Sequence, residues 1–144
     1  MAGSETSKEA VRKALSGDKA TTPLPFMPWV CTHAAKLEQV PLRNMLNDPS
    51  LLARALENAQ RLYGYDMVVN IFDTTIEAEA CGCPVKWTSD KELPVPENHR
   101  PIDNLSESDI SSVTQRGRLP VVIEATKRLK TTLGRTVALS LIHI

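Results

Sequence analysis

Three carboxylates lie close together where an apolar segment gives way to a helix-type pattern. Asp73 directly follows the apolar residues 67–72, and Glu77 and Glu79 come shortly after it. In α/β folds the carboxyl ends of strands carry the chemistry, so a strand that stops at an acid is a candidate site. The same spacing also suits a helix that Asp73 caps while both glutamates face solvent. The residues alone leave these two interpretations level.

Histidine supplies a second candidate for chemistry. His33 follows residues 26–30, a short apolar segment that we expect to form a first strand. It would then lie at the same end of the fold as Asp73, although an exposed loop histidine fits the pattern as well. His99 falls in a polar segment and is expected to be solvated.

The three cysteines, Cys31, Cys81 and Cys83, indicate neither a disulfide framework nor a zinc site. Their number is odd, and no second cysteine pair accompanies the C-x-C formed by Cys81 and Cys83. We expect small buried thiols and no metal ligands in this chain.

The segments that must position these side chains alternate between strand and helix. Asp48 followed by Pro49 marks one helix start, and Gly64 marks its end. Helices are predicted over residues 4–16, 49–63, 76–81 and 119–133, and strands over 26–30, 66–72 and 136–144, with a brief extra strand within 83–88. This alternation favours right-handed βαβ units. We therefore expect an α/β fold with about three parallel strands.

Composition excludes several classes of protein. The 144 residues contain 17 Lys plus Arg and 17 Asp plus Glu, so no basic excess supports a nucleic-acid or anionic-membrane partner. No run approaches the roughly 18 apolar residues of a membrane span. The N-terminus also lacks the apolar core of a signal peptide, and we expect a cytoplasmic protein.

Domain organisation follows from the remaining segments. Residues 1–20 are expected to hold an N-terminal helix, and residues 21–144 an incomplete barrel, because three strands cannot close one. Residues 89–117 are rich in Pro, Ser, Asn and charge, which predicts a long surface loop of the kind that often has a function.

The last predicted strand has no helix after it, which leaves one edge and one face of the sheet uncovered. We expect the N-terminal fragment of a longer protein.

Seven segments, in this order, carry a resemblance to a known family: residues 12–17, 25–29, 48–52, 63–66, 72–73, 77–82 and 118–125. Together they resemble the uroporphyrinogen decarboxylase family of (β/α)8 TIM barrels. That family includes the decarboxylase of haem biosynthesis and the methylcobalamin:coenzyme M and related corrinoid-dependent methyltransferases. The resemblance implies that Asp73 is a catalytic, substrate-facing carboxylate of the barrel mouth. It makes His33, Glu77 and Glu79 candidates for substrate binding.

One departure from the family pattern bears on the substrate. Decarboxylases of the family carry an Arg-Gln-Ala-Gly-Arg segment after the first strand, whose arginines grip the carboxylates of the substrate. Residues 29–36 contain no arginine here, and Lys36 is a weak substitute. This favours the methyltransferase branch. A true decarboxylase of porphyrin biosynthesis and a non-catalytic truncated α/β module are the alternatives.

The methyltransferase branch implies zinc, a corrinoid, and a small-molecule substrate or corrinoid protein as partner. The zinc ligands of that branch come from later strands, so this fragment is expected to bind no cofactor by itself. We also expect the 144-residue chain alone to be inactive, because most of the barrel mouth lies outside it.

Overall fold

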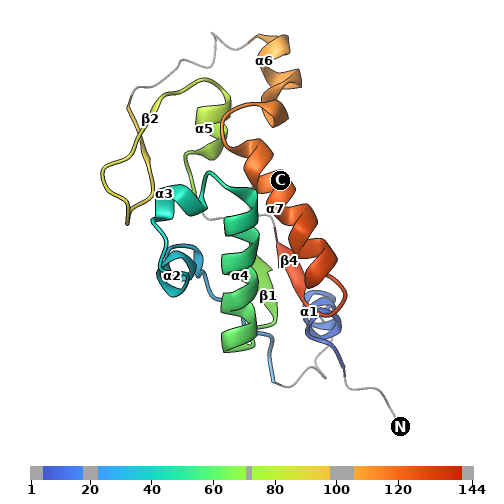
Figure 1. Ribbon diagram of the computed structural model, residues 1–144. Coiled ribbons are helices and arrows are strands. Elements are labelled where there is room, and N and C mark those ends of the chain that lie inside the picture. The colour runs from blue at the N-terminus through green and yellow to red at the C-terminus, as the bar shows by residue number, and fades with distance from the viewer. Residues whose placement is uncertain (1–4, 18–22, 71–72, 98–105, 141–144) are drawn as a thin grey trace.

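Two long helices lie side by side over a pair of parallel strands in the computed structural model, which describes residues 5–17, 23–70, 73–97 and 106–140 (Figure 1). The helices are α4 (Pro49–Tyr63) and α7 (Leu119–Thr132), and the strands are β1 (Met67–Val69) and β4 (Ala138–Ser140). Each long helix precedes one of the strands, as the predicted alternation requires. The expected α/β fold with a parallel sheet is confirmed.

Helix α4 begins and ends as its sequence predicts. The Asp48 carboxylate accepts hydrogen bonds from the backbone N–H groups of Ser50 and Leu51, at 2.7 and 3.0 Å. These contacts lower the pKa of Asp48, because backbone donors stabilise its ionised form. Pro49 occupies the first turn, and Gly64 ends the helix in the left-handed conformation, with φ of 67°.

The parallel pair places Val68 opposite Leu139 and is extended by hydrogen bonds at both ends. The N–H of Ala138 donates to the Asp66 carbonyl, and that of Asn70 donates to the Ser140 carbonyl. The inward faces of both long helices pack on this pair and form the centre of the core, with Leu52, Leu56, Ala59, Val68, Ala125, Leu129 and Val137 buried there. Burial of this apolar surface is what holds the short strands in place.

The first helix, α1 (Ser7–Leu15), packs at the opposite end of the strands from α5 (Ile76–Ala80) (Figure 1). Thr6 and Glu9 form a reciprocal capping box at its start. The backbone N–H of Lys8 donates to the Thr136 carbonyl and its Nζ donates to the Gly134 carbonyl, which ties α1 to the turn before β4.

The prediction of a strand over residues 26–30 is wrong. The backbone N–H of Phe26 donates to Oδ2 of Asp66, and the Phe26 carbonyl accepts from the N–H of Asp66. The rest of the segment is not paired with a strand. Pro28 lacks the N–H that a ladder would need, which explains why pairing stops there. The parallel sheet of the described residues therefore has two strands, β1 and β4, rather than three.

Two short helices that the sequence analysis did not predict follow that segment. They are α2 (Cys31–Leu37) and α3 (Leu42–Met45), and both pack on α4. Gln39, between them, has a positive φ of 55°, a conformation that costs a non-glycine residue free energy.

The expected extra strand is β2 (Val85–Lys86), which pairs antiparallel with β3 (Val95–Pro96). β3, α6 (Glu107–Ser111) and η2 (Val113–Gln115) show that the segment predicted as a long loop has local structure. His99, His143, and the last residues of the two predicted strands, 71–72 and 141–144, lie outside the described residues.

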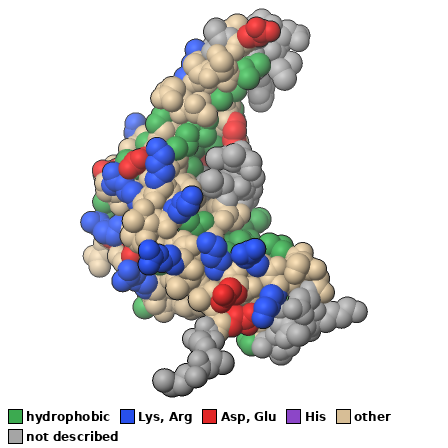
Figure 2. All heavy atoms as spheres, turned by 90° about the vertical axis from the view of Figure 1, so that its right-hand side faces the viewer, with side chains coloured by type: hydrophobic (Ala, Val, Ile, Leu, Met, Phe, Trp, Pro, Cys, Tyr) green, Lys and Arg blue, Asp and Glu red, His purple; other side chains and the backbone are tan. Residues whose placement is uncertain are grey.

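The side of the molecule formed by α7 and α1 carries many Lys and Arg side chains (Figure 2). Several of them pair with acids of their own helix or its flank: Lys127 and Arg128 with Glu124, and Lys13 with Glu5. Exposed pairs of this kind contribute little to stability. Among the helices described, none is long and apolar enough to cross a membrane.

Candidate functional site

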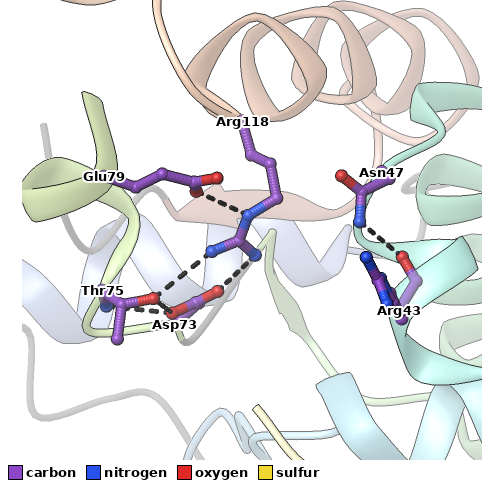
Figure 3. A network of polar contacts seen from close by, with 6 residues as sticks. All are labelled: Arg43, Asn47, Asp73, Thr75, Glu79 and Arg118. Carbon is purple, nitrogen blue, oxygen red and sulfur yellow. Dashed lines mark hydrogen bonds and ion pairs between the residues drawn. The ribbon is translucent and has the colours of Figure 1, made fainter. Parts of the chain in front are cut away.

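The site lies beyond the carboxyl end of β1, where Asp73 and α5 approach the start of α7 (Figure 3). Arg118 is the N-cap residue of α7, and its side chain extends between Asp73 on one side and Glu79 of α5 on the other. Residues 45 positions apart in the sequence are thereby joined by direct contact.

Asp73 uses both of its carboxylate oxygens within the protein. Oδ1 accepts from the backbone N–H of Thr75 at 2.9 Å and from its hydroxyl at 2.7 Å. Oδ2 accepts from Nη1 of Arg118 at 2.5 Å. The side chain of Asp73 has 0% of its surface exposed. Asp73 is thus enclosed by its own turn and by the guanidinium.

Arg118 binds two carboxylates at once. Besides the contact with Asp73, its Nε donates to Oε2 of Glu79 at 2.6 Å, and its Nη2 donates to the Thr75 hydroxyl at 3.3 Å. Only 4% of the Arg118 side chain is exposed, compared with 22% for Glu79. Since one guanidinium faces two carboxylates, the three side chains together carry one net negative charge.

Trp87 packs against this group from the segment after β2. The guanidinium carbon of Arg118 lies 5.2 Å from the centre of the Trp87 ring, and that of Arg43 lies 5.7 Å from it. Both distances are within the range of cation–π attraction. Arg43 belongs to α3 and is exposed, so the cluster has a cationic side that faces solvent.

Gly117 lets the start of α7 approach α5 closely. Its φ is +53°, and a Cβ at this position would lie 3.1 Å from Cγ of Glu79 and 3.2 Å from the backbone N of Ala80. A larger residue would therefore be strained and would also press on α5. This close approach is what brings Arg118 within reach of Glu79.

The other predicted site residues are placed differently. His33 is exposed on α2, and its Nε2 lies 2.8 Å from the hydroxyl of Tyr63 at the end of α4. The ring of His33 also packs on Tyr63, with the two centres 5.6 Å apart, rather than on the Asp73 cluster. Glu77 is half-buried on α5, where the pattern of hydrogen bonds places Glu79, not Glu77, on Arg118. Thus Asp73 and Glu79 are brought together by Arg118 and His33 lies apart from them, while the roles predicted for all four residues stay predictions.

None of the three cysteines forms a disulfide in the described part of the chain; Cys31 and Cys83 are buried, as expected, and Cys81 is half-buried. In the part of the chain that the structure describes, no three His, Cys, Asp or Glu side chains gather in a way that could hold a metal ion. The donors present here therefore do not fit the zinc that the methyltransferase branch implies.

Sequence reasoning missed Arg118 and Trp87 as members of the site. Arg118 directly precedes a helix with proline in its first turn, which is a signal for the helix start but not for the direction of the side chain. A buried carboxylate demands a cation. Had the burial of Asp73 been known, Arg118 would have been among the candidates.

Comparison with known proteins gives the family. The family model "Uroporphyrinogen decarboxylase (URO-D)" matches residues 6–142. A methyltransferase from Methanosarcina mazei has a similar structure, with a TM-score of 0.79 and 23% sequence identity over 94% of this chain. The chain spans 41% of the length of that methyltransferase. No curated protein matches it significantly. Its α/β fold corresponds to part of a TIM barrel, and the chain belongs to the uroporphyrinogen decarboxylase family.

Proposed function

We propose that this chain is the N-terminal part of a corrinoid-dependent methyltransferase, which transfers a methyl group between a corrinoid and a thiol-type acceptor. The observation that carries the proposal is that the arginine in contact with Asp73 is already bound within the protein and is therefore not available to a substrate. The guanidinium of Arg118 is fully engaged by Asp73 and Glu79, and residues 29–36 supply no arginine. A substrate with many carboxylates would need several free arginines to bind.

The structural likeness to a methyltransferase agrees with this proposal, although at 23% identity it speaks for the fold alone. Glu79 would form part of the wall of the substrate site at the carboxyl ends of the strands, with the buried Asp73 and Arg118 behind it. A corrinoid and zinc would act through other parts of the enzyme, since the donors described here do not fit a metal.

A decarboxylase of porphyrin biosynthesis is the second candidate, and Arg43 is the observation that favours it. Its guanidinium is exposed beside Trp87 and forms no ion pair with the acids of the described residues. One such arginine could bind one carboxylate of a substrate.

The DNA downstream of codon 144 offers a direct test. We expect the reading frame to continue through a Gly-Pro turn and later a His-x-Cys motif. The extended protein, supplied with zinc, methylcobalamin and a thiol, should then form the methylated thiol and should leave uroporphyrinogen unchanged. Decarboxylation of uroporphyrinogen instead would refute the methyltransferase proposal. The 144-residue chain serves as the control and is expected to be inactive.

A further inference from the structure

The geometry points to Glu79, rather than Asp73, as the carboxylate that this site presents to a ligand, with Asp73 and Arg118 as positioning residues behind it. The inference rests on the proposed function only in taking the carboxyl end of β1 as the ligand site. It does not depend on which group is transferred.

Neither carboxylate oxygen of Asp73 is open to a ligand, since both are bound and buried. Thr75 occupies Oδ1 with two donors, Arg118 occupies Oδ2, and the side chain is completely buried. A ligand could reach Asp73 only by breaking the ion pair with Arg118, which would leave charged groups buried without a partner.

Glu79 has the opposite character. Its Oε2 is held by Nε of Arg118, whereas its Oε1 takes no hydrogen bond from the described residues, and 22% of its side chain is exposed. Glu79 therefore combines a fixed orientation with an open acceptor. Fixed, partly desolvated acceptors of this kind are what a binding site needs to orient a ligand.

Arg118 binds Asp73 and Glu79 together, so the position of Asp73 fixes that of Glu79. Because Nη1 is fixed on Asp73 and Nη2 on Thr75, the planar guanidinium can aim Nε only toward α5. Among the carboxylate oxygens of Asp73 and Glu79, Oε1 of Glu79 is the one that accepts no hydrogen bond from the described residues. Such an oxygen should attract a cation or an N–H, O–H or S–H donor and repel a carboxylate.

Carboxylate labelling of the 144-residue chain tests this assignment without any catalytic assay. The chain is treated with a water-soluble carbodiimide and glycinamide, and amidation is followed at each acid by peptide mass spectrometry. Glu124, with a 42% exposed side chain, is the internal reference. We expect Glu79 to be amidated more slowly than Glu124, and Asp73 to resist. Labelling of Asp73 as fast as Glu79 would overturn the assignment.

Two variants test the positioning roles, and they should act in opposite directions. Arg118→Lys keeps the charge but cannot bind both carboxylates, so labelling of Glu79 should rise at least about twofold. Asp73→Asn leaves Glu79 as the sole anionic partner of Arg118, so its labelling should fall by about the same factor. General loosening of the fold would raise labelling in both variants and at Glu124 too. If Glu79 responds to neither change, Arg118 and Asp73 do not position it.

The labelling and the methyl-transfer assay can fail separately. If no methyl transfer is found but the labelling pattern holds, the assignment of Glu79 stands and only the proposed reaction falls. If methyl transfer is found but Asp73 is the labelled carboxylate, the proposed reaction stands and the assignment of Glu79 falls.

Discussion

Among single residues, Arg118 should contribute most to the stability of this region. Arg118→Met keeps much of the length of the side chain but leaves Asp73 buried without a cation. We expect the free energy of unfolding, measured by urea titration, to fall by about 3–5 kcal/mol. The double variant Asp73→Asn/Arg118→Met should recover a large part of the loss, because the fully buried charge of Asp73 is then removed as well. Equal stability of Arg118→Met and the unmodified chain would contradict the ion pair.

The burial of the Tyr65 phenol predicts how the free energy of unfolding changes at high pH. The residue is 2% exposed, and burial raises the pKa of its phenol to about 12. Because the folded-state pKa lies above the unfolded value of about 10, the neutral phenol contributes in full to the free energy of unfolding below pH 10. This contribution is lost as the pH rises toward 12. The expected loss is roughly 2–3 kcal/mol.

The measurement is the free energy of unfolding of Tyr65→Phe and of the unmodified chain, compared at several pH values. Tyr65→Phe should lack this part of the alkaline decline. Tyr63→Phe is the matched control, because Tyr63 is exposed, and it should keep the decline. If both variants decline alike, burial of the Tyr65 phenol is not its cause.

The sequence predicted the acids of the site but not the donors that form hydrogen bonds and ion pairs with them. Asp73 stood out because it follows the apolar residues 67–72, and that position is visible in the sequence. Its complete burial depends on Thr75 and on Arg118, which is 45 residues away. No local pattern reports on such a contact, because it arises from the packing of α7 on α5.

At the level of helices and strands, Gly117 controls how closely α7 approaches α5. Gly117→Ala would be strained at φ +53° and would also press on Glu79 and Ala80. Gly64→Ala is a matched control, since Gly64 has φ of +67° but a Cβ there would meet no atom within 4 Å. We expect Gly64→Ala to cost about 1–2 kcal/mol, the cost of the left-handed conformation, and Gly117→Ala to cost more. Urea unfolding of both variants measures the difference, and equal losses would show that the contact with α5 carries no free energy.

The elements that the sequence predicted well are those with complete local signals. Helix α4 has a capping acid, a proline in its first turn and a terminal glycine, and its bounds agree with the prediction. The segment 26–30 and helices α2 and α3 lack such signals. Helix α2 has no capping side chain, and it is held by packing on α4 that the sequence pattern does not show. Local chemistry therefore predicts the long helices, and tertiary contacts decide the short elements.

For the molecule as a whole, an apolar surface beside α1 is exposed to solvent. Leu24 and Phe26 are 78% and 65% exposed, and with Leu15 and Met67 they line a surface cavity of about 250 Å³. A TIM barrel has eight parallel strands, whereas the described residues supply one parallel pair. Apolar side chains at the rim of such a partial sheet lack the neighbours that a closed barrel would give them.

This surface predicts that the 144-residue chain self-associates in solution. Burying Leu24 and Phe26 against a second copy removes apolar area from water, which is the main driving force for association. Sedimentation velocity over a range of concentrations should show a sedimentation coefficient that rises with concentration. The double variant Leu24→Lys/Phe26→Lys should stay monomeric, because charges at the contact would have to be desolvated. Ile110→Lys, which changes an equally exposed residue on α6, should associate like the unmodified chain. If Ile110→Lys also abolishes association, or if the unmodified chain is monomeric throughout, the surface beside α1 is not where copies meet.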